Sequence, residues 1–459
     1  MEQITKPHCG ARLDRLPDCR WHTSMFAMVA FGLLVCWSNA VGGLILAQLK
    51  ELGWTDNSTT ATFSAITTAG MFLGALGGGI IGDKTGRKNA FILYEAIHII
   101  SMVIGAFSPN MTFLIACRFV MGVGLGALLV TLFAGFTEYM PGRNRGTWSS
   151  RVSFIGNWSY PLCSLIAMGL TPLISAEWNW RVQLLIPAVL SLIATVIAWR
   201  SFPESPRWLE SRGRYQEAEQ VMRAIEDGVI RQTGKPLPPV VTENDDKQPR
   251  LVPYSALLTG VLLKRVILGS FVLIAMNVVQ YTLINWLPTI FMTQGINLKD
   301  SIVLNTMSMF GAPFGIFIAM LVMDKIPRKT MGVGLLVLIA VLGYIYSLQT
   351  SMLLITLIGF FLITFVYMYV CYASAVYVPE IWPTEAKLRG SGLANAIGRI
   401  SGIAAPYAVA VLLNSYGVTG VFVLLGAVSI IVAVAIATIG IETKGVSVES
   451  LGIDAVTSK

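Results

Sequence analysis

Charged residues are scarce in this chain. Asp, Glu, Lys and Arg make up 13% of its 459 residues, whereas hydrophobic residues make up 54%. Soluble domains carry about 25% charged residues, so the composition excludes an ordinary soluble protein. Many apolar runs reach the ~20 residues that a helix needs to cross a hydrocarbon core of about 30 Å. Because backbone polar groups in lipid must be satisfied within the segment, we predict an all-α polytopic membrane protein.

Histidine and cysteine are also rare, with three and six residues. None has the spacing of a metal site, and the sequence has no nucleotide-binding loop and no paired nucleophile and base. We therefore expect no catalytic residue, metal, cofactor or enzymatic activity. The formal net charge of +8 is spread over alternate short loops, which indicates membrane topology and not a nucleic-acid partner.

Twelve spans in two pseudo-symmetric six-helix halves are expected. They cover about 25–49, 61–82, 90–107, 111–137, 147–172, 181–201, 262–290, 301–323, 331–348, 352–378, 390–414 and 418–440. The predicted segments are a tail (1–24), a first half (25–201), a central loop (202–261), a second half (262–440) and a second tail (441–459). The first tail has no short apolar stretch before a cleavage site, so no removable signal peptide is expected.

Loops that carry Lys and Arg alternate with loops that carry almost none. The basic segments are the first tail and the turns 84–88, 143–145, 325–329 and 387–389. Basic loops stay on the cytoplasmic side of a membrane. We therefore expect both termini in the cytoplasm.

The central loop carries its own helix signals. Ser205 followed by Pro206 predicts a helix start, and Gly213 can close that helix. A second amphipathic helix is expected from Tyr215 to Asp227, ended by Gly228. Residues 231–250, with four prolines and mixed charge, have the composition of a flexible linker.

Three short patterns recur at nearly one offset. The charged turn that begins at Asp83 returns 241 positions later at Asp324. Glu138 and Pro141 return as Glu380 and Pro383 at an offset of 242, and the segment 203–205 is echoed by 441–443 at an offset of 238. Such a duplication predicts two parallel six-helix halves with a substrate bound between them near the midplane, as in transporters.

These residues resemble the major facilitator superfamily over essentially the whole chain. The matching motifs are Gly79–Lys88, Arg118 with Gly122, Gly124 and Gly126, Pro203–Trp208 and Glu442–Gly445. The last two are similar to motifs of sugar porters and related organic-ion carriers, and the chain is similar to enterobacterial inner-membrane metabolite transport proteins. It departs from sugar porters in Asn277–Trp286 and Cys371–Pro379, and Asn39 lies where aromatic-acid symporters carry an aspartate.

The resemblance implies that the charged turns gate the inner face and stabilise the outward-open form. The predicted gating residues are Gly79, Asp83, Gly86, Arg87, Lys88, Arg118, Glu138, Arg145, Asp324, Arg328, Glu380 and Arg389. We expect Asp83 to pair with Arg87, and Glu138 to act with Arg145. The alternative is that the basic residues only set topology, but topology alone requires neither Asp83 nor Gly86.

Arg399 is the most informative residue inside a span. A guanidinium within a membrane is costly and does not readily lose its proton, so it needs water, an acid or a ligand. The predicted substrate-binding residues are Asn39, Asn157, Gln280, Tyr281, Asn285, Tyr369, Tyr372 and Arg399. We favour binding of a substrate carboxylate by Arg399. The alternatives are a buried ion pair and a side chain that reaches the inner face.

Glu95 and His98 lie three residues apart, so they share one face of a span and are candidates for proton coupling. A purely structural pair is the alternative. The predicted function is alternating-access uptake of an organic anion such as a sugar acid. The resemblance implies proton coupling and a monomer in a bacterial cytoplasmic (inner) membrane. A neutral sugar or polyol is the second choice, followed by export of amphiphiles and by a membrane sensor that moves nothing.

Overall fold

The computed structural model describes residues 7–17, 19–35, 40–141, 145–240, 253–323 and 325–444. These residues form helices and no strand, and nine of the helices are long and apolar enough to cross a membrane. They fall into two compact units. Unit 1 comprises residues 1–38, 69–159 and 184–248, and unit 2 comprises 39–68, 160–183 and 249–459. The units group segments by how they pack and not by their order in the sequence. They do not test the predicted division into two halves, which stays a prediction.

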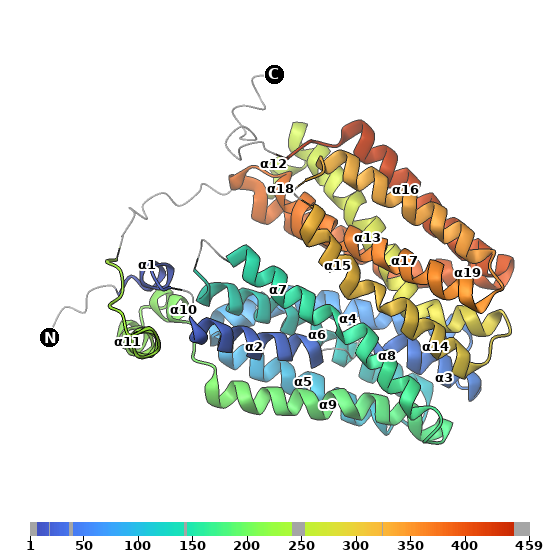
Figure 1. Cartoon of the computed structure of the whole chain (residues 1–459), viewed down its shortest axis with the longest axis horizontal. Helices are drawn as coiled ribbons and strands as arrows, with labels where there is room; N and C mark the ends of the chain where they lie inside the picture. Colours follow the sequence, from blue (N-terminus) through green and yellow to red (C-terminus); the bar gives the residue numbers. More distant parts are fainter. Residues whose placement is uncertain are drawn as a thin grey trace. The chain divides into compact units, whose positions relative to one another are not determined.

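The helices of the first half correspond to the first six predicted spans (Figure 1). They are α2 (Arg20–Val35), α3 (Val41–Glu51), α4 (Asn57–Thr85), α5 (Arg87–Ala106), α6 (Met111–Tyr139), α7 (Arg145–Asn157), α8 (Ser159–Leu170) and α9 (Ala176–Ser201). The predicted span 25–49 overlaps two helices, α2 and α3, and the span 147–172 overlaps α7 and α8.

Glycine lets α4 and α6 approach closely in unit 1. A Cβ atom on Gly74 would lie 2.0 Å from the carbonyl oxygen of Val123, and one on Gly126 would lie 2.1 Å from that of Met71. Small residues of this kind allow the backbones of membrane helices to pack against each other. A Cβ atom on Gly79 would meet open space, so helix packing does not require glycine at that position.

The central loop begins as predicted. Helix α10 (Pro206–Ser211) starts after Ser205, whose hydroxyl accepts a hydrogen bond from the Trp208 amide at 3.2 Å. Gly213 follows it with a φ of 72°. The predicted end of the next helix is wrong: α11 (Tyr215–Thr233) continues through Gly228 and ends at Gly234. Val229 in the added turn is fully buried, and this burial outweighs the helix penalty of a glycine.

The first tail folds onto this loop. Helix α1 (Cys9–Asp14) packs with α10 and α11 through a core that includes Leu13, Met222 and Ile225 (Figure 1). Arg12 and Arg15 each form an ion pair with Glu226, at 2.7 and 2.6 Å. The sequence predicted only a basic tail that sets topology, whereas the structure gives its arginines specific acidic partners.

The second half lies in unit 2. Its helices are α12 (Tyr254–Leu257), α13 (Gly260–Thr293), α14 (Leu298–Met309), α15 (Gly311–Val322), α16 (Arg328–Ser347), α17 (Met352–Cys371), the π-helical turn η2 (Tyr372–Tyr377), α18 (Val378–Glu380) and α19 (Thr384–Ile439). The predicted span 301–323 is therefore two helices. The last two spans run together as α19, which is broken at Gly417 (φ 64°) inside the predicted 415–417 connection.

Candidate transport site and charged turns

A tight turn joins α4 to α5 at Gly86. Its φ is 99°, a conformation that side chains with a Cβ rarely adopt. A Cβ there would also lie 2.2 Å from a carboxylate oxygen of Glu204. Glycine is therefore needed at this position both for the backbone and for the approach of Glu204.

Arg87 connects three elements of unit 1. Its guanidinium lies 2.7 Å from a carboxylate oxygen of Asp83 at the end of α4, and 2.7 Å from one of Glu138 near the end of α6. The expected pairing of Asp83 with Arg87 is present. Glu138 pairs with Arg87, while the side chain of Arg145, its expected partner, lies outside the described residues.

Glu204 completes this first cluster. Its carboxylate accepts hydrogen bonds from the backbone amides of Arg87 and Lys88, at 2.7 and 3.2 Å. An acid at a helix N-terminus satisfies free amides and complements the helix dipole. The Trp208 indole and the Arg212 guanidinium donate to the Asp83 carbonyl at 2.7 and 2.6 Å, so the central loop caps the end of α4.

The second charged turn is built in the same way in unit 2. Arg328 donates to both carboxylate oxygens of Glu380, at 3.0 and 3.1 Å. Glu442 accepts from the backbone amides of Arg328 and Lys329, at 2.7 and 3.1 Å. Burial acts to raise the pKa of Glu442, but these backbone hydrogen bonds outweigh burial and lower it. Asp324 lies outside the described residues.

The site prediction did not include Glu204 or Glu442. Both follow their arginines by similar distances in sequence, 117 and 114 residues. The recurrence of the segment 203–205 at 441–443 was the signal that could have identified them. A repeated acid near a repeated basic turn is a candidate cap for the helix that the turn begins.

Two predicted gating residues have other surroundings. Arg118 is 2% exposed, and its guanidinium lies 3.5 Å from the sulfur of Met121. The Arg389 guanidinium lies 5.1 Å from the centre of the Tyr254 ring. Their role in gating stays a prediction.

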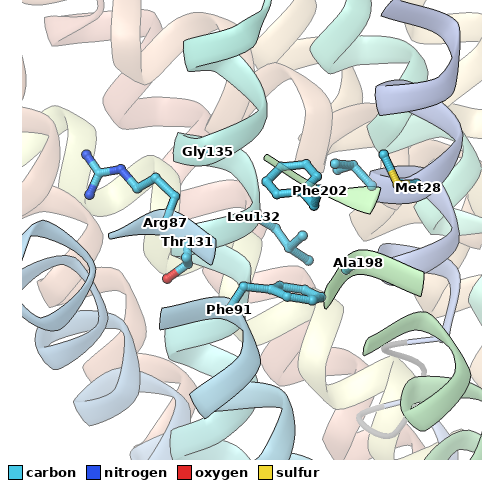
Figure 2. A pocket seen from close by; sticks show the side chains of 9 residues that line it. Met28, Arg87, Phe91, Thr131, Leu132, Gly135, Ala198 and Phe202 are labelled. Carbon is cyan, nitrogen blue, oxygen red and sulfur yellow. The ribbon is translucent and has the colours of Figure 1, made fainter. Parts of the chain in front are cut away.

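A pocket of about 360 Å³ lies beside the first charged cluster in unit 1. Its lining, shown in Figure 2, is Met28, Val29, Arg87, Phe91, Thr131, Leu132, Gly135, Ala198 and Phe202. Arg87 is the one charged residue in this lining, and its guanidinium is already held by Asp83 and Glu138. The pocket is therefore mainly apolar, and we do not assign the polar substrate to it.

Arg399 lies on the part of α19 that packs against α13. A Cβ on Gly398 would lie 2.7 Å from the Leu273 Cβ, and one on Gly402 would lie 3.2 Å from the Tyr281 ring. One terminal nitrogen of Arg399, Nη1, is buried and has no hydrogen-bond partner among the described residues. Within those residues Arg399 has no ion pair, which does not favour the buried-pair alternative.

Further polar side chains lie on α13 and close to it. Gln280 and Tyr281 of α13 lie near the hydroxyl of Tyr367 in α17, and the Tyr367 ring lies 5.4 Å from that of Tyr160. The Tyr367 hydroxyl is buried without a partner of hydrogen-bond geometry in the described chain. Tyr367 was absent from the site prediction, although it lies two residues before Tyr369, which the prediction included. Asn285 is 5% exposed on α13.

Other predicted binding residues have local partners. The Tyr369 hydroxyl donates to the Val272 carbonyl at 3.1 Å, and Tyr372 stacks on Tyr377 with ring centres 5.0 Å apart. The Asn157 amide donates to the Ser153 carbonyl of its own helix at 2.8 Å, and Asn39 lies outside the described residues. These contacts are those of packing residues, and roles in binding stay predictions.

Glu95 and His98 face each other in α5, as their spacing predicts. A carboxylate oxygen of Glu95 lies 3.5 Å from Nδ1 of His98, and both side chains are fully buried. Gly124 lets α6 approach this pair closely, because a Cβ there would lie 3.0 Å from the His98 amide. This separation is longer than an ordinary hydrogen bond, and proton coupling stays a prediction.

Comparison with known proteins supplies the family. Residues 24–454 match the model of the family described as "Sugar (and other) transporter". The chain is 93% identical, over all of both chains, to the provisionally named metabolite transport protein YdjK of Escherichia coli (strain K12). It is 42% identical to the inner membrane metabolite transport protein YdjE of the same strain, over 98% of this chain and 99% of that one.

A solved structure shares the fold. The partially occluded inward-open xylose transporter XylE from E. coli matches with a TM-score of 0.72 and 17% identity, over 93% of this chain and all of that one. The predicted twelve-span major facilitator fold is thus confirmed, and the family consists of transporters and not enzymes. The chain belongs to the sugar (and other) transporter family of the major facilitator superfamily, as a membrane transporter of the metabolite and sugar type.

Proposed function

We propose that this transporter carries a small organic anion, such as a sugar acid or another carboxylate, into the cell by alternating access. The observation that carries the proposal is the buried Nη1 atom of Arg399, which has no partner among the described residues. A guanidinium in this position binds a carboxylate through paired, charge-assisted hydrogen bonds. Uncharged partners would leave its charge uncompensated in a medium of low dielectric constant.

Polar groups around α13 support a small hydroxylated substrate. Gln280, Tyr281 and the Tyr367 hydroxyl form one polar region, and two tyrosine rings at 5.4 Å border it. Hydroxyl and amide groups bind sugar hydroxyls, and aromatic faces bind sugar rings. The same region also supports the second candidate, a neutral sugar or polyol, in which case Arg399 is structural.

Proton coupling is assigned to Glu95 and His98. The pair is fully buried, with a carboxylate oxygen 3.5 Å from a ring nitrogen, and buried ionisable residues in spans commonly belong to proton relays. We expect Glu95→Gln to make uptake insensitive to a protonophore. The charged turns gate the inner face, both termini are cytoplasmic, and the working unit is a monomer in the inner membrane.

A thermal-shift panel on the purified full chain tests the substrate class. Sugar acids and simple carboxylates are compared with neutral sugars and polyols of matched size. We expect stabilisation by acids alone, and we expect Arg399→Ala and Arg399→Lys to lose it, because lysine lacks the paired geometry. Arg223→Ala is the matched control, since Arg223 is 73% exposed on α11.

Neutral sugars that stabilise the protein and its Arg399→Ala variant equally would overturn the organic-anion proposal. That result would assign the chain to neutral substrates and leave Arg399 a structural role. Acids that stabilise both forms equally would place the anion elsewhere in the protein.

A further inference from the structure

Two buried tyrosines make the same contact in the two units. In unit 1 the Tyr139 hydroxyl, at the end of α6, donates to the Pro203 carbonyl at 2.6 Å. In unit 2 the Tyr377 hydroxyl, at the end of η2, donates to the Ile441 carbonyl at 3.1 Å. Each carbonyl belongs to the residue directly before an acid that caps a helix start. Each tyrosine therefore holds the backbone from which such an acid projects.

The two cap acids are Glu204 and Glu442. Their carboxylates accept hydrogen bonds from the first amides of α5 and α16, where a negative charge is favourable. Both acids lie in stretches without regular secondary structure, the cap segments 203–205 and 441–443. No helix fixes the backbone there, so contacts from outside the cap segments decide where each acid stands.

The repeat carries this contact at an offset of its own. Tyr139 and Tyr377 lie 238 positions apart, as do the two cap segments. The ion-pair acids Glu138 and Glu380 lie 242 apart, a shift of about one helical turn. Each tyrosine thus keeps its place relative to the cap segment, 64 residues further on, and not relative to the ion-pair acid. The duplicated feature is the bond between the tyrosine and the cap segment.

Proline makes the two contacts unequal. The Ile441 amide donates back to the Tyr377 hydroxyl at 3.0 Å, so this tyrosine makes two bonds to one residue. Pro203 has no amide hydrogen, so Tyr139 makes one bond to its cap segment. Both tyrosines are fully buried, and a buried carbonyl or amide that loses its partner is costly. We therefore expect the second cap segment to be held more firmly than the first.

We propose that Tyr139 and Tyr377 are positioning residues of the charged turns. Each holds a cap acid over the helix start of its turn, and so sets how firmly that turn is held. Packing fixes both hydroxyls, because the centre of the Tyr139 ring lies 5.1 Å from that of Phe202, and the Tyr377 ring stacks on Tyr372 at 5.0 Å. The effect on transport rests on the proposed gating role of the turns, whereas the positioning does not.

Hydrogen exchange on the purified full chain tests the assignment without a substrate. Tyr139→Phe keeps the ring and removes the hydroxyl. We expect this variant to speed exchange at the Arg87 and Lys88 amides about fivefold and to leave the start of α16 unchanged. Tyr377→Phe should speed exchange at the start of α16 about tenfold and leave α5 unchanged, because it loses two hydrogen bonds.

A double-mutant cycle shows whether the tyrosine acts through its acid. Glu204→Ala removes the cap outright, so Tyr139→Phe should add nothing in that background. Additive increases in exchange would make Tyr139 a general structural contact and overturn the proposal. Tyr94→Phe is the matched control, because its hydroxyl donates at 3.3 Å to the Gly78 carbonyl and not to a cap segment. It should leave exchange at the Arg87 amide at the parental rate.

The same cycle in unit 2 pairs Tyr377→Phe with Glu442→Ala, and additive increases there would overturn the proposal for the second turn. Parental exchange at both helix starts in the phenylalanine variants would overturn it for both turns. Faster exchange in every helix of a unit, with a lowered thermal midpoint, would show lost packing and would also overturn it. No substrate enters this experiment, so its failure is independent of Arg399 and of the thermal-shift panel.

Discussion

The two charged turns share one arrangement of ion pairs and hydrogen bonds but differ in the partners of their arginines. In each, an arginine that begins a helix pairs with an acid from the end of a neighbouring span. A second acid caps the amides of the same helix start. Arg87 divides its guanidinium between Asp83 and Glu138, whereas Arg328 gives two bonds to Glu380 and also donates to the Met323 carbonyl. The comparison teaches that the repeat preserves the paired arginine and the cap, and varies what surrounds them.

The largest expected effect on stability separates the two arginines. The Arg328 side chain is 7% exposed and donates two hydrogen bonds to Glu380, so Arg328→Ala removes a nearly buried guanidinium and an ion-pair partner of that acid. We expect a loss of roughly 2 kcal/mol in stability and more than tenfold in uptake of the acid found by thermal shift. Arg87→Ala should lose less stability, because the Arg87 side chain is 16% exposed and its partner Asp83 is 62% exposed and can be hydrated.

Thermal midpoints and initial uptake rates measure this difference. Arg231→Ala in α11 is the control, since it lies outside both clusters and should behave as the parent. Equal losses of stability and uptake at both arginines would show that the partners of Arg87 depend on their arginine as strongly as Glu380 does. The expected difference between the two turns would then be wrong.

The second effect concerns the turn residues, Gly86 and its repeat partner Pro327. Gly86→Ala strains a φ of 99° and pushes Glu204 away from the α5 amides, so we expect about a tenfold loss of uptake. Pro327 has a φ of −56°, which any residue adopts, so Pro327→Gly should cost less than twofold. Gly79→Ala is the matched glycine control, because its Cβ would meet open space.

Uptake in vesicles with equal amounts of inserted protein measures these variants. A normal rate for Gly86→Ala would mean that Glu204 does not need its present position. A large loss for Gly79→Ala would show that the motif glycine acts through a state other than the one described here.

Much of this arrangement could be predicted from the sequence. The repeat offset and the Lys/Arg pattern located both turns, and the repeat also supplied Glu138 and Glu380. Separations of 51 and 52 residues between each arginine and its acid carry no periodic signal, so only the repeat could link them. The cap by Glu204 was missed because the loop was interpreted as a connector between halves.

The remaining errors have local physical causes. Gly228 is a helix breaker by propensity, but Val229 beyond it belongs to the core that α1, α10 and α11 share, which sequence alone does not reveal. The first tail has few residues and strong charge, and its folding depends on acids more than 200 positions away. The polar partners of Tyr367 come from α13, so its place near Gln280 requires the packed structure.

The third prediction isolates gating from stability at Asp83. This acid is 62% exposed, and exposed ion pairs contribute about 0–1 kcal/mol. Asp83→Asn should therefore leave insertion and the thermal midpoint nearly unchanged while it abolishes uptake. Near-normal uptake would reduce Asp83 to a topology signal, and a large fall in midpoint would make its role structural. Lys84→Gln, beside it, is the charge control.

The smallest effect concerns helix α1 of the first tail, which packs on α10 and α11 of the central loop. Burial acts to raise the pKa of Glu226, but hydrogen bonds from Arg12 and Arg15 outweigh it and lower the pKa below the usual 4.5. A carboxylate whose pKa is lowered by folding stabilises the folded form at pH values above its ordinary pKa. This contribution to stability is lost as the pH falls through the lowered pKa. The contact of α1 with α11 should therefore persist between pH 5 and 8 and weaken only below pH 4.5.

Hydrogen exchange measures the contact of α1 with α11 and also compares the two charged turns. Arg12→Ala should speed exchange in α10 and α11, because Glu226 loses one of its two arginine partners. It should also speed exchange at the end of α4, because α10 and the residue after it hold the Asp83 carbonyl through Trp208 and Arg212. Exchange around Arg328 should not change. Faster exchange at both turns would mean that the tail stabilises the whole transporter, and faster exchange at neither would mean that the first turn holds without it.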